Sequence, residues 1–333
     1  MLKVAISGFG RIGRCLVWAL HERGLSDEIE VVAINDLVEP SVLAHLLRHD
    51  TTHGHFGKSV GVDGDHLLVD GKRIRCLAEK DATQLPWKEL GVDLVLECSG
   101  KMKKRALQAA HLEAGAQRVL VAYPVADADR TVVFGVNHQQ LTAQDRIVSN
   151  ASCTTNCLAP IAKVLDDTFG LEQGQMTTIH AYTNDQNLID KAHSDLYRAR
   201  AAAVNMIPSK TGAAQAVGLV LPHLAGKLDG MAVRVPTINV SMVDLHAILK
   251  KEAKPEEIHA AMHKAAQGPL KNILRVNEEP LVSGDFNHAP ESSIYDATQT
   301  RSIGRQVKVI SWYDNEWGFT NRMIDVARVM DAL

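Results

Sequence analysis

The first 36 residues place a glycine-rich loop within a strand–helix–strand pattern, which constrains the fold more than any other stretch. Residues 3–7 predict a short apolar strand, and glycines follow at positions 8, 10 and 13. A helix is expected next, with Cys15 and Leu16 on its apolar side, and a second apolar strand over residues 29–35 ends at Asp36. A G-x-G-x-x-G run in this setting is typical of a dinucleotide-binding unit.

Each glycine of this loop has a separate physical role. Gly8 permits the tight turn, Gly10 lets the backbone approach a pyrophosphate, and Gly13 allows close packing of helix on strand. Asp36 lies about 20 residues beyond the last glycine, where a carboxylate holds a ribose hydroxyl. The predicted cofactor-binding residues of this segment are Gly8, Gly10, Arg11, Ile12, Gly13 and Asp36.

The periodicity changes near the middle of the chain, and 333 residues exceed what one core usually organises. Strands alternate with helices up to about residue 150, including one over 131–135, which predicts a mostly parallel sheet. Strands are expected near 176–182, over a long stretch at 231–250 and at 306–313, with helices at 255–266 and 321–330. The expected class is α/β, a Rossmann domain over 1–152 followed by an α+β catalytic domain over 153–315 with a mostly antiparallel or mixed sheet. The terminal helix at about 316–333 is expected to pack on the first domain.

Composition excludes several classes of protein. The net charge of −3 offers no general attraction to nucleic acid, and no apolar stretch is long enough for a membrane span. Five cysteines in a long chain do not indicate a disulfide framework, which favours the cytoplasm. His49, His53 and His55 lie close together, but we interpret them as a polar loop and predict no metal site.

Cys153 is the candidate nucleophile because it lies where a short strand turns into a helix, among Ser and Thr residues suited to N-capping. Lowering a thiol pKa by about 2 units requires about 2.7 kcal/mol. A helix terminus supplies at most about 2 kcal/mol. We therefore expect a cationic histidine as the second contributor. The alternative is a buried inert cysteine, which fits Cys157 better than Cys153 because hydroxyls surround Cys153.

His180 is the preferred base because it ends a strand and precedes a loop rich in hydroxyls and amides. Cationic or hydroxyl-bearing residues that suit a phosphate group lie elsewhere in the second half: Thr183, Arg198, Thr211 with Gly212, and Arg234. Spacing alone does not bring these residues together.

Several long segments resemble the glyceraldehyde-3-phosphate dehydrogenase family along essentially the whole chain. They cover residues 8–14, 149–160, 180–186, 195–203, 210–214 and 312–318. The resemblance implies that Cys153 is the nucleophile and that His180 activates it and donates a proton. It places the substrate phosphate at Thr183, Asp185 and Arg234, and inorganic phosphate at Ser152, Thr154, Thr211 and Gly212, bordered by Arg198. It places the nicotinamide carboxamide at Asn315 and implies a homotetramer.

The resemblance also implies an activity: oxidation of D-glyceraldehyde 3-phosphate with inorganic phosphate to 1,3-bisphosphoglycerate, through a cysteine thioester. Two of four departures from the family pattern fall on predicted cofactor-binding residues. Tyr123 places a bulky ring near the nicotinamide ribose, and Lys80 and Lys191 fall near a 2′-phosphate in members that use NADP. Asp36 repels such a phosphate, so we favour NAD with NADP as the alternative.

Two other functions stay open. Thr237-Ile238-Asn239 and residues 297–301 resemble a close relative that oxidises erythrose 4-phosphate. From a different class, a redox-sensing or RNA-binding protein would retain the fold without the reaction. The intact cysteine and histidine count against that interpretation. Roles in glycolysis, in gluconeogenesis and in a specialised reaction with an acceptor such as arsenate all fit the sequence.

Overall fold

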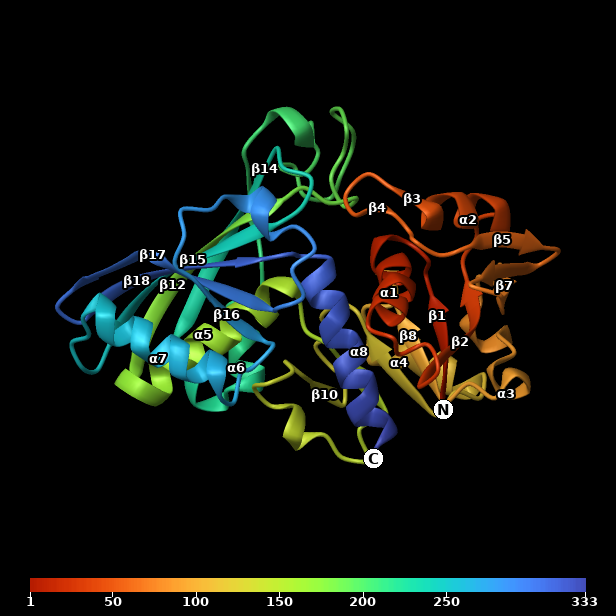
Figure 1. Cartoon of the computed structure of the whole chain (residues 1–333), viewed down its shortest axis with the longest axis horizontal. Helices are drawn as coiled ribbons and strands as arrows, with labels where there is room; N and C mark the ends of the chain where they lie inside the picture. Colours follow the sequence, from red (N-terminus) through yellow and green to blue (C-terminus); the bar gives the residue numbers. More distant parts are fainter. The chain divides into compact units, whose positions relative to one another are not determined.

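The computed structural model describes all residues from 1 to 333, and the chain divides into two compact units. The first comprises residues 1–132, 138–151 and 320–333, and the second comprises residues 133–137 and 152–319. Residues 133–137 and Ser152, which the sequence analysis placed in the first domain, thus cluster with the second unit, as do residues 317–319 at the start of the terminal helix. Each unit contains one large sheet, shown from red to yellow and from green to blue in Figure 1.

The first unit is built on a nine-stranded sheet. In spatial order its strands are β10 (Arg130–Thr131), β11 (Ile147–Ser149), β9 (Arg118–Val121), β8 (Leu94–Glu97), β1 (Leu2–Ser7), β2 (Ile29–Asn35), β7 (Lys72–Leu77), β6 (His66–Val69) and β5 (Val60–Asp63). All pairs from β10 to β7 are parallel, and β6 and β5 extend the sheet in antiparallel pairing. The expected strand at 131–135 is wrong beyond Thr131.

Helices and a two-stranded ribbon complete the first unit. The helices are α1 (Arg11–Glu22), α2 (Pro40–Arg48), α3 (Trp87–Leu90), α4 (Arg105–Glu113) and, from residue 320, most of α8 (Trp317–Asp331). The ribbon pairs β3 (His49–Asp50) with β4 (Gly54–His55). Trp87, Val95 and Val119 are fully buried in one apolar cluster of this unit. The expected Rossmann domain is therefore confirmed, with cofactor-binding loops at the carboxyl ends of the parallel strands.

The second unit is built on a seven-stranded mixed sheet. In spatial order its strands are β13 (Ile207–Lys210), β14 (Leu228–Val235), β12 (Leu171–Ala181), β15 (Ser241–Leu249), β18 (Gln306–Tyr313), β17 (Ser293–Ile303) and β16 (Leu274–Asn277). Its helices are α5 (Cys153–Phe169), α6 (Val217–Val220) and α7 (Pro255–Gln267). Only β12–β14 and β16–β17 are parallel. The expected mixed sheet is confirmed.

The single long strand expected at 231–250 is wrong, because the chain forms β14 and β15 with a break at residues 236–240. Pro236 directly follows β14 and has no N–H to donate to a neighbouring strand. Val240, just before β15, has a φ of +67°, which interrupts the extended backbone. This break allows β14 and β15 to lie on opposite sides of β12.

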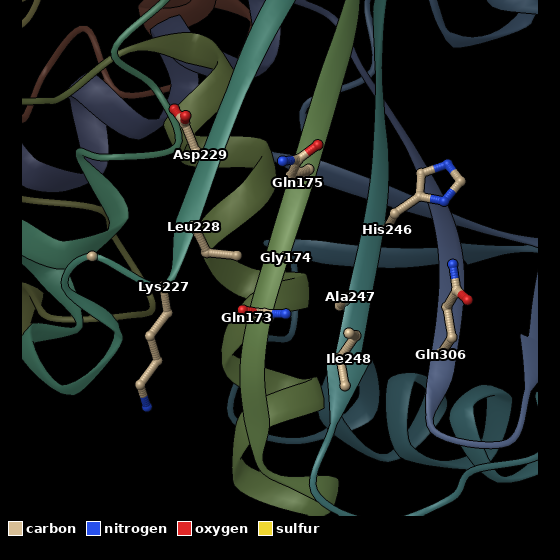
Figure 2. A pocket seen from close by; sticks show the side chains of 11 residues that line it. Gln173, Gly174, Gln175, Lys227, Leu228, Asp229, His246, Ala247, Ile248 and Gln306 are labelled. Carbon is tan, nitrogen blue, oxygen red and sulfur yellow. The ribbon is translucent and has the colours of Figure 1, made fainter.

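The face of the seven-stranded sheet remote from α5 carries a groove of about 400 Å³. Figure 2 shows Gln175, His246 and Gln306 projecting from the neighbouring strands β12, β15 and β18. The groove is lined by polar and aliphatic side chains and contains no cysteine. It therefore lacks the thiol that the chemistry expected at Cys153 requires.

No helix in the structure is both long and apolar enough to cross a bilayer.

Candidate functional site

Cys153 is the first residue of α5, the helix that begins after β11. Ser152 caps this helix: its backbone is extended and its Oγ accepts a hydrogen bond from the amide of Thr155 at 3.0 Å. The residue before the cap, Ala151, has a φ of +57°, in the left-handed region that is unfavourable for a residue with a side chain. The predicted turn from strand to helix is therefore present, with the thiol in the first helical turn.

His180 lies beside this thiol. It is the penultimate residue of β12, is 4% exposed, and places Nε2 at 3.6 Å from Sγ of Cys153. Its ring packs edge-on against Tyr313, with centroids 5.9 Å apart. The hydroxyl of Tyr313 lies 2.8 Å from those of both Thr154 and Thr178, so it joins the start of α5 to β12. The sequence did not single out Tyr313 for this role.

Arg234 reaches the other side of the His180 ring. The two residues are direct partners in the parallel pairing of β12 with β14, which puts them side by side. Nη1 of Arg234 lies 3.0 Å from Nδ1 of His180 and donates to the carbonyl of Ala181 at 3.0 Å. Its Nε is buried without a hydrogen-bond partner. A buried, incompletely paired guanidinium is suited to receive an anion.

The hydrogen bonds of Nδ1 define what His180 can do. When Nδ1 carries the proton, it donates to the carbonyl of Ala181 at 2.7 Å, and the lone pair of Nε2 faces the thiol. When Nδ1 accepts from Arg234, the proton is on Nε2 instead. Only the first tautomer allows Nε2 to remove a proton from Cys153, so the Ala181 carbonyl favours the basic form.

The protonation states correct one expectation from the sequence. Burial, and then the charges of Arg234 and Arg198, lower the pKa of His180 to about 3, with the Ala181 carbonyl opposing. Burial raises the pKa of Cys153, although the charge of Arg234 and hydrogen bonds from Thr154 oppose it. The lowered pKa of His180 favours a neutral imidazole, in place of the cationic histidine expected from the sequence. Arg234 is the cation near the thiol, and the two pKa shifts together favour a neutral thiol beside a neutral imidazole.

The residues expected to bind phosphate all lie in the second unit, but they differ in availability. Nε of Arg198 donates to Ser209 at 2.8 Å, and its Nη1 pairs with Asp185. Thr211 accepts from the amide of Ala213 at 3.2 Å, and Gly212 is exposed. The hydroxyl of Thr154 already contacts Tyr313 and is buried, so for an anion Thr154 offers less than the sequence analysis assumed.

Thr183 is half-buried just beyond β12, and Ser152 is half-buried at the start of α5. The carboxylate of Asp185 is 51% exposed and reduces the positive charge that Arg198 presents. The phosphate candidates therefore combine one paired guanidinium, Arg198, with one incompletely paired guanidinium, Arg234.

Asn315 is held in place from two sides. Its Oδ1 accepts from the hydroxyl of Ser241 at 2.8 Å, and that hydroxyl also accepts from the amide of Ala181. The adjacent Asp314 accepts from the amides of Trp317 and His288 at 2.7 Å. The hydrogen bonds from Asn315 through Ser241 end at Ala181, the residue after His180. Asn315, which is expected to hold the nicotinamide, is therefore positioned by the same strands as the catalytic candidates.

In the first unit, the glycine loop has the space that a dinucleotide requires. Gly8 has a φ of +88°, and a Cβ on it would lie 2.6 Å from the amide nitrogen of Ser99. A Cβ on Gly13 would lie 2.4 Å from the carbonyl of Gly8, whereas one on Gly10 would meet no atom within 4 Å. Gly8 and Gly13 are therefore required by packing, and Gly10 borders open space. The residues fit the pyrophosphate expected there.

Asp36 and Arg11 fix the surroundings of this loop. Oδ2 of Asp36 accepts from the amide of Phe9 at 2.8 Å, which ties the carboxylate to the loop. Nη2 of Arg11 donates to Asp50 at 3.0 Å in a two-bond ion pair, so the side chain of Arg11 points to the β3–β4 ribbon. Ile12 is half-buried in the first turn of α1.

The remaining cofactor candidates differ in burial. Lys80 is exposed beyond β7, the neighbour of β2 in the sheet, and Lys191 is exposed in the second unit. The hydroxyl of Tyr123 donates to Glu97 and accepts from the amide of Met102, both at 3.1 Å. Glu97 is fully buried against His111. The ring of Tyr123 is thus fixed by its hydroxyl within the first unit.

Comparisons with known proteins cover nearly the whole chain. Residues 2–105 match the family described as glyceraldehyde 3-phosphate dehydrogenase, NAD binding domain, and residues 152–315 match the C-terminal domain of the same enzyme. The chain is 57% identical to glyceraldehyde-3-phosphate dehydrogenase of Xanthobacter flavus over 333 residues, 100% of this chain and 99% of the relative. It is 55% identical to the enzyme of that name from Pseudomonas aeruginosa over 331 residues, 99% and 98% of the two chains.

Proposed function

The chain belongs to the glyceraldehyde-3-phosphate dehydrogenase family of NAD-dependent oxidoreductases, and we propose that it oxidises D-glyceraldehyde 3-phosphate with inorganic phosphate to 1,3-bisphosphoglycerate. The observation that carries the proposal is the 3.6 Å separation between Sγ of Cys153 and Nε2 of His180 at the start of α5. A nucleophile within reach of an oriented base is the arrangement that covalent catalysis needs.

In the first step Sγ of Cys153 attacks the aldehyde carbon, and its proton passes to Nε2 of His180. The new C–S bond gives a hemithioacetal whose oxygen is stabilised by the imidazolium and by the amides at the start of α5. NAD, held by the glycine loop and Asn315, would supply the acceptor for the hydride that leaves this carbon, and loss of that hydride would leave a thioester on Cys153. An oxygen of inorganic phosphate then attacks the thioester carbon, and Cys153 leaves as the thiolate and recovers its proton.

Substrate binding and activation of the base are coupled in this proposal. The charges of Arg234 and Arg198 are among the groups that lower the pKa of His180. An anion bound beside these guanidinium groups offsets their charge and raises the pKa of His180 toward its usual range. The phosphate of the substrate therefore makes Nε2 a stronger base at the moment when the thiol has to be deprotonated.

The test is a pair of cysteine variants. We expect Cys153→Ser to abolish oxidation of glyceraldehyde 3-phosphate, because a hydroxyl is a far weaker nucleophile, while NAD binding stays near wild type. Cys157→Ser is the matched control: this buried thiol lies one turn further along α5, and burial raises its pKa to about 12. Substantial turnover by Cys153→Ser in a steady-state assay would overturn the proposal.

Erythrose 4-phosphate is the second candidate substrate. Thr237, in one of the segments that resemble the tetrose enzyme, accepts a backbone hydrogen bond from Tyr182, next to the phosphate candidate Thr183. We favour the triose because residues 180–185 and 210–214, which adjoin the site, resemble the triose enzyme. Comparing kcat/KM for the two aldehyde phosphates decides between them. The same assay with both cofactors tests NAD against NADP, and at least a tenfold preference for NADP would overturn our choice.

The proposal includes a homotetramer in the cytoplasm. All five cysteines are free in the structure, and a reducing compartment keeps the proposed nucleophile available. If the protein is instead a redox-sensing or RNA-binding protein without catalysis, the wild-type chain shows no turnover in this assay.

A further inference from the structure

Figure 1 shows the β3–β4 ribbon beside α2. Three histidines of the first unit lie at the end of α2 and on this ribbon. His45 lies in the last turn of α2, and His49 follows four residues later as the first residue of β3. His55, in β4, is the direct partner of His49 in the antiparallel pairing. All three are exposed. The sequence analysis interpreted this stretch as a polar loop and did not include His45.

The nitrogen atoms of His49 and His55 are separated by a distance that suits a shared metal ion. Their Nδ1 atoms are 3.1 Å apart. Two nitrogens bound to one ion at about 2.0–2.1 Å, with angles between octahedral and tetrahedral values, are separated by about 2.9–3.4 Å. One ion can therefore replace the proton that joins the two rings, with little movement of either side chain.

His45 supplies a third imidazole from the neighbouring helix turn. Its ring centroid is 5.1 Å from that of His49, and the centroids of His49 and His55 are 5.2 Å apart. This ring contact places His45 beside the His49–His55 pair, so His45 is the candidate for a third ligand. Three imidazoles and an open position for water are a ligand set that Zn²⁺ and Ni²⁺ accept.

The surroundings leave these imidazoles available. No carboxylate pairs with His45, His49 or His55, and the nearby Asp50 is occupied by Arg11 and by the amides of Thr52 and His53. The positive charge of Arg48 lies close by and opposes a cation, which limits the affinity. The site is therefore expected to be exchangeable and not a permanent structural centre.

We propose that His45, His49 and His55 form a surface site for a divalent transition-metal ion of the Zn²⁺ or Ni²⁺ type, with Nδ1 of His49 and of His55 as two of its ligands. Binding there joins α2 to the β3–β4 ribbon. Because Asp50 of this ribbon also pairs with Arg11 of the glycine loop, the ion stabilises the ribbon that faces that loop.

The test is calorimetric titration of the full chain with Ni²⁺, for wild type and for His49→Gln and His55→Gln. We expect one ion per chain in the wild type, and at least a tenfold weaker affinity in either variant, because each loses a direct ligand. His66→Gln is the matched control, since His66 is a partly exposed histidine of the same unit whose Nδ1 pairs with Asp65. It should bind Ni²⁺ as the wild type does.

Two further measurements keep the result unambiguous. Cys153→Ser should retain the Ni²⁺ affinity, because the proposed site contains no thiol. Ni²⁺ should raise the Tm of the wild type and of His66→Gln, but not that of His49→Gln. The unfolding transitions recorded in these measurements also show that the variants are folded. Equal Ni²⁺ binding in wild type, His49→Gln and His55→Gln would overturn the proposal. So would loss of binding in Cys153→Ser alone.

Discussion

At the scale of single residues, Arg234 has the largest influence on the Cys153–His180 pair. It contacts Nδ1 of His180, its charge opposes the rise in the pKa of Cys153, and its buried Nε has no partner. We expect Arg234→Gln to lower kcat/KM for glyceraldehyde 3-phosphate by about 10–100-fold, the effect of losing about 1.5–3 kcal/mol of charge-assisted hydrogen bonding. Steady-state kinetics measure it.

Free D-glyceraldehyde provides the control for Arg234, because it presents the same aldehyde without the phosphate. The Arg234→Gln variant should lose much less activity toward this substrate, and Arg234→Lys should recover part of the loss toward the phosphorylated one. An equal loss with both aldehydes would mean that Arg234 does not bind the phosphate.

The histidine itself makes the stability of the protein depend on pH. His180 has a pKa of about 3 in the folded chain, compared with about 6.5 when unfolded. Below pH 6.5 the unfolded chain takes up a proton that the folded chain does not, so folding loses up to about 1.4 kcal/mol per pH unit at this residue. We expect His180→Asn to remove this loss.

Urea unfolding between pH 6 and pH 4 measures the effect, at one fixed protein concentration. The free energy of unfolding of wild type should fall more steeply with decreasing pH than that of His180→Asn. Parallel curves for the two proteins would contradict a neutral, buried His180.

At the scale of elements, two glycines of the same loop have different roles: Gly13 is required by packing, and Gly10 borders the space for the ligand. Gly13→Ala forces a Cβ to within 2.4 Å of the carbonyl of Gly8, and we expect it to destabilise the fold by about 1–3 kcal/mol. Gly10→Ala meets no protein atom within 4 Å, so its Tm should match wild type while NAD affinity falls by about tenfold or more. Thermal unfolding and NAD titration separate the two. A lowered Tm in Gly10→Ala would contradict the open space at Gly10.

The same elements show how far local sequence determines structure. The strand, loop and helix around Gly8–Gly13 were predicted because each is set by its own residues and their neighbours. The proximity of His180 to Arg234 was not predictable, because it arises from parallel pairing of strands whose partners lie 54 residues apart. Tyr313 likewise contacts Thr154 across 159 positions. Such contacts follow from strand order, which no local pattern encodes.

At the scale of the whole molecule, the chain consists of two units, each with its own sheet. The proposed homotetramer predicts a solution mass of about four chains of 36.3 kDa each. Size-exclusion chromatography with light scattering measures this mass. A mass of one chain at micromolar concentration would contradict the proposed assembly.

Net charge belongs to this scale as well. The excess of three acidic charges provides no general attraction to phosphate backbones, so RNA should bind only weakly at physiological salt. Filter binding is the measurement. Tight, sequence-selective retention of RNA would favour the alternative interpretation of the fold as an RNA-binding protein.

The backbone at Ala151 affects the residue that follows it by two positions. A φ of +57° costs a non-glycine residue about 1–3 kcal/mol, which the surrounding fold has to supply. Glycine at this position would remove that cost, but it would also enlarge the set of conformations open to the chain just before Cys153. One methyl group thus lowers the conformational entropy of the segment that presents the sulfur. The placement of the sulfur proposed as the nucleophile therefore depends in part on the methyl group of Ala151.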